Sequence, residues 1–199
     1  MNVSDHTVEL FVLKCAVIES GLRTTLAEFD TGNSGALSKA DDEQLEPFIK
    51  QYDLANRKNA AHMARYYEIF YLLENDIRRL IVETMEAAHG QAWWDSQVPP
   101  GVLEEVRKNR EREAQAAVSV RSEDDIDYTT FGQLGDIIRA NWSDFAGMLS
   151  NQSAVSRVMA ALNMLRGTIA HCGVLAEDEV DRLKLAIRDW FRVLEGPKS

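Results

Sequence analysis

The stretch "YYEIFYLLENDIRRLI", residues 66–81, contains the strongest helical pattern of the chain. Its large apolar side chains recur with the spacing of an α-helix, so they share one side of it. The residues of this stripe are Tyr66, Ile69, Phe70, Leu73, Ile77, Leu80 and Ile81. The helical pattern extends from Asn56 to His89, and Gly90 follows as a typical C-terminal stop. A helix of this length would be roughly 50 Å long, which is enough to form the spine of a domain.

Helical patterns also occupy the chain on both sides of this stretch. The further helices that we predict cover residues 8–29, 102–117, 130–142, 153–170 and 177–194. Thr130 and Gln133 make a capping-box pattern at the start of the third of these, residues 141–144 are expected to bend, and residues 119–127 are expected to form a polar loop. The last helix is expected to bury Val180, Leu183, Ile187, Trp190 and Phe191. Almost no segment alternates as a strand does, and no internal repeat recurs at a fixed period. We therefore expect an all-α protein, an up-and-down helical bundle with short links. Residues 56–195 are expected to form the bundle, and residues 1–55 an N-terminal helical extension packed on it.

The acidic balance of the chain limits what it can bind. Its 199 residues carry 22 Lys and Arg against 32 Asp and Glu, a formal net charge of -10, and 45% of them are hydrophobic. A chain of this size can bury about two thirds of its unfolded surface in one core. The negative charge excludes a broad basic face that coats nucleic acid, but it leaves room for a small basic pocket.

Cysteine usage and hydropathy indicate a cytoplasmic protein. The two cysteines, Cys15 and Cys172, form no C-x-x-C pair, which argues against a disulfide scaffold or a zinc knuckle. Asp5, Glu9 and Lys14 interrupt any signal-peptide core. No run of about 18 apolar residues could span a bilayer, so no membrane association is expected.

Most familiar catalytic signatures are missing. The sequence contains no phosphate-binding glycine loop, no G-x-S-x-G and no H-E-x-x-H. Glu86 and His89 form a single E-x-x-H, whereas a di-iron bundle site needs two copies and two further carboxylates. His171 and Cys172 do not suit a thiol protease, because neighbours on a helix point about 100° apart. We therefore expect neither a metal nor a cofactor.

One polar pair near the end of the chain does carry a motif. "LRGTIAHC", residues 165–172, places Arg166 and His171 five positions apart at the close of an apolar helical pattern. The motif is accompanied, in order, by "YYEIFYLLENDIRRLI", "WW" then "VP" at 93–99, "DYTTFGQLGDIIRANWSDF" at 127–145 and "LNMLRGTIAHCGVLAEDEV" at 162–180. Together these segments resemble the HEPN (higher eukaryotes and prokaryotes nucleotide-binding) superfamily. They are most similar to the HEPN domain appended to a PIN-type mRNA-surveillance endoribonuclease, over about residues 60–192.

The resemblance implies a metal-independent endoribonuclease that works as a homodimer. Arg166 would hold the phosphate, and His171 would move a proton near neutral pH. Glu74, Arg78 and Asn163 match accessory polar positions. Members of the superfamily commonly line one cleft with motifs from two subunits. Some act as toxins or defence effectors, so a cognate antitoxin or partner protein is a further expected partner besides RNA or a nucleotide.

Two geometric points leave alternatives open. Five residues turn an ideal helix by about 500°, so Arg166 and His171 would point about 140° apart unless the helix ends near Ala170, as Gly173 suggests. An Arg and a His near a helix C-terminus are also explained by the helix dipole alone.

Interpretations without a catalytic role remain open for the accessory residues and for the whole chain. Glu74 and Arg78 could be an ordinary surface i,i+4 ion pair. Gly167 stands where HEPN proteins usually carry a polar residue. The alternative to the enzyme is a non-catalytic helical module that binds RNA, a nucleotide or a partner protein.

Overall fold

The computed structural model describes residues 44–116 and 118–196. Contacts divide the chain after Lys58 into two units, each of which is described by itself. Residues 44–49 are helical and belong to the first unit. The elements that follow are α3 (Leu54–His89), α4 (Trp93–Gln97), α5 (Pro100–Gln115), the 3-10 helix η1 (Asp125–Tyr128), α6 (Phe131–Ala140), α7 (Trp142–Phe145), α8 (Gln152–Ala170) and α9 (Glu177–Leu194). No strand occurs in the described part of the chain, which confirms the all-α prediction.

The long helix α3 is the predicted spine, and its C-terminal half supplies one wall of the core. Its buried apolar side chains are Phe70, Leu73, Ile77, Ile81 and Met85. The helix ends as predicted, since Gly90 adopts φ +77, a left-handed conformation that costs glycine little. Ile69 was expected in the buried stripe but is 37% exposed, so that part of the prediction is wrong.

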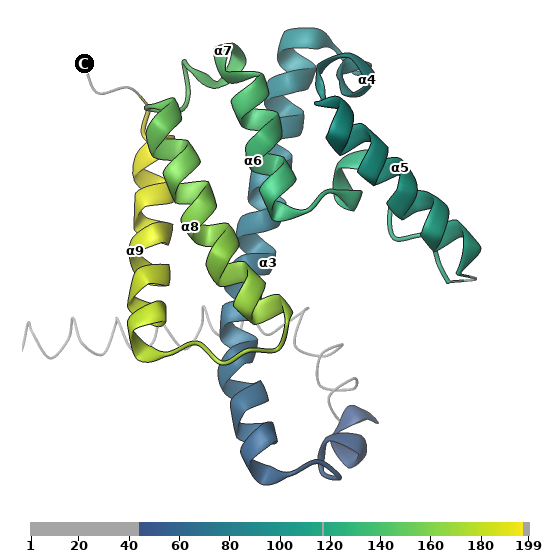
Figure 1. The fold of residues 1–199 in the computed structure, drawn as a ribbon, viewed down its shortest axis with the longest axis vertical. Helices are drawn as coiled ribbons and strands as arrows, with labels where there is room; N and C mark the ends of the chain where they lie inside the picture. Colours follow the sequence, from purple (N-terminus) through teal and green to yellow (C-terminus); the bar gives the residue numbers. More distant parts are fainter. Residues whose placement is uncertain (1–43, 117, 197–199) are drawn as a thin grey trace, which may run out of the picture. The chain divides into compact units, whose positions relative to one another are not determined.

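Helices α6, α8 and α9 build the rest of the bundle (Figure 1). α8 contacts both α6 and α9, and α9 returns antiparallel to α8 after the short link of residues 171–176. Phe131 and Trp190 are almost completely buried, and Phe131 packs edge-on against Phe70 of α3 at 6.2 Å between ring centroids. Burial of each such ring stabilises the fold by about 1.5–3 kcal/mol.

Local sequence signals set the helix ends. Thr130 and Gln133 form the expected capping box at the start of α6, where each residue's side chain accepts a hydrogen bond from the other's backbone N–H. The Asn151 side chain accepts a hydrogen bond from the Ala154 N–H at the start of α8. The bend expected at residues 141–144 is instead a break at Asn141 followed by the short helix α7.

Two further expectations about packing had different outcomes. Phe191 was expected to be buried, but it is 57% exposed, because the core-facing side of α9 is filled by Leu183, Ala186, Trp190 and Val193. The helix expected at residues 8–29, and most of the N-terminal extension expected at residues 1–55, lie outside the described residues. That extension and its boundary at residue 56 stay predictions.

Candidate functional site

A cavity of about 580 Å³ opens between α3, α8, η1 and the loop that precedes η1. Its charged lining consists of three arginines and two carboxylates: Arg78, Arg121, Arg166, Glu74 and Asp127. Three positive charges against two negative ones give this lining a net charge of +1, in a chain whose formal net charge is -10. Glu113, which pairs with Arg121 from outside the lining, offsets this charge, so the cavity is far less acidic than the chain as a whole but is not strongly basic.

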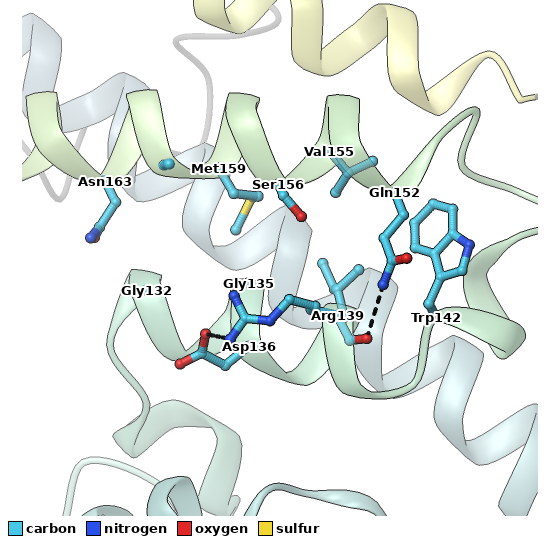
Figure 2. Close-up of a pocket in the computed structure, with 12 residues that line it drawn as sticks. Gly132, Gly135, Asp136, Arg139, Trp142, Gln152, Val155, Ser156, Met159 and Asn163 are labelled. Atoms are coloured by element: carbon cyan, nitrogen blue, oxygen red, sulfur yellow. Dashed lines mark hydrogen bonds and ion pairs between the residues drawn. The ribbon is translucent and has the colours of Figure 1, made fainter.

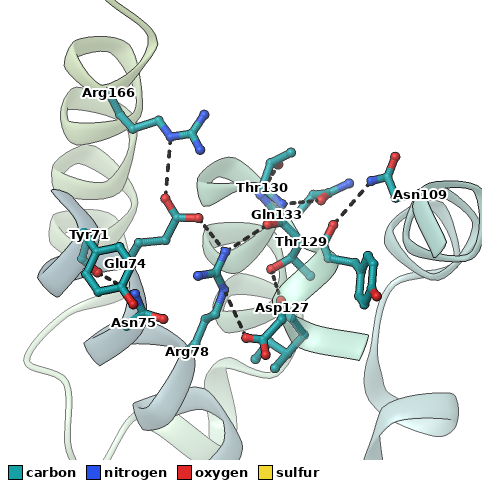
Figure 3. A network of polar contacts seen from close by, with 12 residues as sticks. Tyr71, Glu74, Asn75, Arg78, Asn109, Asp127, Thr129, Thr130, Gln133 and Arg166 are labelled. Atoms are coloured by element: carbon teal, nitrogen blue, oxygen red, sulfur yellow. Dashed lines mark hydrogen bonds and ion pairs between the residues drawn. The ribbon is translucent and has the colours of Figure 1, made fainter. Parts of the chain in front are cut away.

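Glu74 bridges two of these arginines (Figure 3). Its Oε1 accepts a hydrogen bond of 2.5 Å from Arg78 Nη2, and its Oε2 lies 3.5 Å from Arg166 Nε. The side chain of Glu74 is only 12% exposed. The predicted i,i+4 pair of Glu74 and Arg78 thus exists, but it is buried, so its interpretation as a surface ion pair is wrong.

Arg78 is committed to the protein itself. Besides Glu74, its Nη2 also donates to the backbone carbonyl of Thr129 at 3.2 Å. Its Nε is buried without a hydrogen bond and has Asp127 Oδ1 at 3.9 Å. Figure 3 shows the guanidinium between Glu74 on α3 and the segment of Asp127 and Thr129. Arg78 therefore ties the floor of the cavity to the loop that enters α6.

Of the two arginines that contact Glu74, Arg166 is the more exposed to solvent. Its side chain is 37% exposed, and its contact with Glu74 involves Nε alone. Within residues 44–116 and 118–196, its two terminal nitrogens have no hydrogen bond or ion pair. A guanidinium held at Nε with its terminal nitrogens open can bind a phosphate through two parallel hydrogen bonds.

His171 is not brought into this cavity. It is the C-cap residue of α8, and its side chain is exposed and makes no polar contact with the residues that the structure describes. The helix does end at Ala170, as the sequence predicts. The structure of one chain therefore unites Arg166 with Glu74 and Arg78 but leaves His171 outside their network.

The end of α8 has a specific backbone geometry. The Gly173 N–H donates to the Thr168 carbonyl at 2.8 Å, and the Cys172 N–H donates to the Ile169 carbonyl at 3.1 Å, which is a Schellman motif. The left-handed residue is Cys172, with φ 60, although glycine favours that position. Gly173 is needed for space instead, because a Cβ there would lie 2.8 Å from Thr168 Cγ2.

Asn163 faces a different groove. It lines a cavity of about 240 Å³ between α6 and α8, next to Gly132, where a Cβ on the glycine would lie 3.3 Å from Asn163 Nδ2. Figure 2 places Asn163 at one end of this groove and Trp142 at the other. Asn163 is not among the residues that line the Arg166 cavity, so one chain does not bring it to the other site residues.

Several residues of the cavity were not proposed as site residues from the sequence, and four of them bear on its chemistry. Tyr67 and Tyr71 lie in the helical stretch of residues 66–81, but they fall beside its apolar stripe and are 64% and 59% exposed. Arg121 and Asp127 belong to a segment expected to be a plain polar loop. The spacing of Tyr67, Tyr71, Glu74 and Arg78 on one helical side is the signal that could have found the tyrosines.

A buried carboxylate fixes Arg121. Glu113 of α5 accepts hydrogen bonds from the Arg121 N–H at 2.5 Å, from Arg121 Nε at 2.6 Å and from the Tyr128 hydroxyl at 3.2 Å. The Arg121 guanidinium also lies 4.8 Å from the centre of the Tyr128 ring. The backbone N–H of Arg121, together with its side chain and Tyr128, lowers the pKa of Glu113 although burial opposes this.

The E-x-x-H pair of α3 has another role in the structure. His89 Nε2 lies 3.0 Å from Asp144 Oδ2, so the histidine links the end of α3 to α7. Among the described residues, no group of three His, Cys, Asp or Glu side chains is placed to hold a metal ion. No helix in that part of the chain is both long and apolar enough to cross a membrane.

Comparison with known proteins identifies a family for most of the chain. Residues 68–195 match a family model described as Swt1-like HEPN. The matched segment contains all five residues proposed for the site from the sequence, and all but one of the residues that line the cavity. Neither curated proteins nor solved structures match the chain significantly.

Proposed function

The chain belongs to the Swt1-like HEPN family, and from this membership and the cavity we propose that it is a cytoplasmic, metal-independent endoribonuclease. The observation that carries the proposal is Arg166, whose terminal nitrogens are open in a cavity that three arginines line. The link to a PIN-type endoribonuclease stays a prediction.

The proposed chemistry assigns one role to each residue of the motif. The 2′-hydroxyl of RNA attacks the adjacent phosphate, and the 5′-oxygen of the next nucleotide leaves. His171 takes the proton of the attacking 2′-hydroxyl, and the leaving 5′-oxygen takes up a proton from water. Arg166 holds the phosphate as negative charge develops on it. Glu74 orients Arg166 through Nε, and Arg78 holds Glu74 from the other side.

The position of His171 supports a site made by two copies of the chain. Its side chain is exposed and outside the cavity that contains Arg166. A second copy related by a two-fold axis could supply its own His171 to this cavity and receive the first copy's His171 in return. We therefore propose a homodimer in which each active site combines Arg166 of one chain with His171 of the other.

Cleavage of a labelled single-stranded RNA tests the chemistry. We expect cleavage that persists in chelator, leaves a 2′,3′-cyclic phosphate and fails on the 2′-deoxy analogue. Arg166→Ala and His171→Ala should each abolish most of the rate while helical circular dichroism is kept. The matched controls are Arg188→Ala on α9 and His62→Ala on α3, which replace residues that do not line the cavity. If neither motif variant changes the rate, the assignment is wrong.

Mixing of inactive variants tests the arrangement across two copies. A heterodimer of Arg166→Ala with His171→Ala keeps one site that has both residues, so a randomly mixed 1:1 population should recover about a quarter of the wild-type rate. A site within one chain would recover nothing, because every site would lack one residue. Light scattering that shows a monomer at micromolar concentration would also contradict the dimer.

The second candidate function is a non-catalytic module that binds RNA, a nucleotide or a partner protein. The absence of His171 from the cavity, and the neutralisation of Arg166 by Glu74, favour it. RNA binding that depends on Arg166, without cleavage of any RNA by the wild type, would decide for this function.

A role as a toxin or defence effector, with a cognate antitoxin, is the finer form of the enzyme proposal. It is tested by growth of a bacterial host that expresses the wild type or His171→Ala. Growth arrest by the wild type alone supports the role, and equal growth of the two strains contradicts it.

A further inference from the structure

We propose that Tyr67 and Tyr71 form a stacking platform for a nucleobase of single-stranded RNA, beside the phosphate that Arg166 holds. The inference rests on the proposed function only in assuming that the cavity takes RNA. It adds a subsite that binds the base of a nucleotide, whereas the arginines are proposed to contact only phosphate.

The first observation is the exposure of the two rings. Tyr67 and Tyr71 are 64% and 59% exposed, although both line the cavity that contains Arg166. Their ring centroids are 6.4 Å apart and their planes differ by 34°, so the rings form a tilted pair. An exposed aromatic face offers a base a contact that does not depend on its sequence, because every base has a π-face.

The second observation is their placement on α3. Tyr67, Tyr71, Glu74 and Arg78 follow one another at four, three and four residues, so they lie on one side of the helix. Figure 3 shows Tyr71 beside Glu74, the carboxylate that contacts Arg166. The aromatic rings and the phosphate-binding arginine therefore belong to one continuous surface, as a nucleotide requires.

The third observation is a further arginine that is held in place at the same cavity. Arg121 lines the cavity, and Glu113 and Tyr128 fix its guanidinium. Its side chain is still 57% exposed. A fixed, exposed guanidinium can hold a neighbouring phosphate, so the cavity offers contacts for the backbone and for the base of a short RNA segment.

The experiment compares two probes of equal length and charge. One is a short, labelled single-stranded RNA, and the other is the same ribose-phosphate chain without bases. Binding is measured by fluorescence anisotropy with full-length protein that carries His171→Ala, so that cleavage does not interfere. We expect the RNA to bind at least ten-fold more tightly than the abasic chain.

The variants separate base contacts from phosphate contacts. Tyr67→Leu and Tyr71→Leu should each weaken RNA binding by about ten-fold, within the range of base–aromatic stacking, and leave abasic binding unchanged. Tyr67→Phe and Tyr71→Phe keep the ring and should bind as the parent does. Arg166→Ala and Arg121→Ala should weaken both probes equally. The matched control is Phe191→Leu, which removes an exposed ring from α9 outside the cavity.

The other outcomes overturn distinct statements. If the parent binds RNA through Arg166 but both tyrosine-to-leucine variants bind equally well, the platform is wrong and the proposed function stands. If the parent binds neither probe, the proposed function fails and the platform fails with it. If the leucine variants instead dissociate a dimer in light scattering, the two rings belong to a contact between chains, and the platform is wrong.

Discussion

Arg78 and Arg166 share the carboxylate of Glu74 but differ in burial, which predicts different effects on stability. The Arg78 side chain is 15% exposed and that of Arg166 is 37% exposed. Arg78→Ala leaves the buried Glu74 carboxylate with only its longer contact to Arg166 and should lower the free energy of unfolding by about 3 kcal/mol. Arg166→Ala removes one half-exposed contact and should cost less than about 1 kcal/mol. Urea denaturation measures both.

Arg188→Ala serves as the baseline for this comparison, since Arg188 lies on α9 outside the Glu74 network. If Arg166→Ala destabilised the fold as strongly as Arg78→Ala, Arg166 would be a structural residue. A loss of RNA binding in that variant would then say nothing about contact with phosphate.

For single residues, the sequence predicted contacts between charged side chains better than it predicted backbone conformations. The spacing of Glu74 and Arg78 predicted their pairing, because residues four apart meet on a helix. It could not predict that Arg166 joins them, since this contact spans α3 and α8. Gly173 correctly marked the end of α8, but the left-handed residue is Cys172. The glycine is explained instead by its tight contact with Thr168.

At the scale of elements, Glu113 ties the loop after α5 to that helix, and its contacts predict a pH dependence. The pKa of Glu113 is lowered from 4.5, chiefly by the backbone N–H of Arg121. A carboxylate whose pKa is lower in the folded state stabilises the fold above its ordinary pKa. That contribution is lost as the pH falls below 4.5 and through the lowered folded value.

The variant Glu113→Gln should therefore be less stable than the wild type at pH 7, and the difference should shrink at pH 3.5. Denaturant midpoints at the two pH values measure it. Glu111→Gln is the control on the same helix, because the Glu111 side chain is 54% exposed and pairs with an exposed Arg107. A difference for Glu113→Gln that is equal at both pH values would mean that its charge does not hold the loop.

The longer helices of the described residues were predictable to within a few residues, but the short helices α4 and α7 and the loop segment before α6 were not. The predicted helix at 177–194 matches α9, and that at 153–170 starts one residue after α8 does, because apolar periodicity and capping residues are local signals. Residues 119–127 were expected to be a polar loop. Ile126 and Tyr128 of η1 are in fact buried, since a short segment without periodicity gives no sign of which side chains it buries.

For the molecule as a whole, composition predicted that positive charge would be confined to a small site, but not how two chains would assemble around that site. A net charge of -10 left room only for a local cluster of basic residues, and the three arginines of the Arg166 cavity are such a cluster. The spacing of His171 from Arg166 left open whether the two side chains would meet. Whether they meet within one chain depends on how α8 ends. Whether they meet across the proposed dimer depends on the contact surface between two chains.

The small number of exposed arginines in the cavity predicts that RNA binding depends only weakly on salt concentration. Arg121 and Arg166 are the two more exposed arginines of the cavity, whereas Arg78 is buried in its own contacts. Each phosphate held on a single strand contributes about -0.7 to the slope of log K against log salt, so two contacts give about -1.4. Arg166→Ala should bring the slope to about -0.7. Anisotropy titrations over a series of salt concentrations measure it, and a slope several times steeper that persists in Arg166→Ala would place the RNA on a different face of the protein.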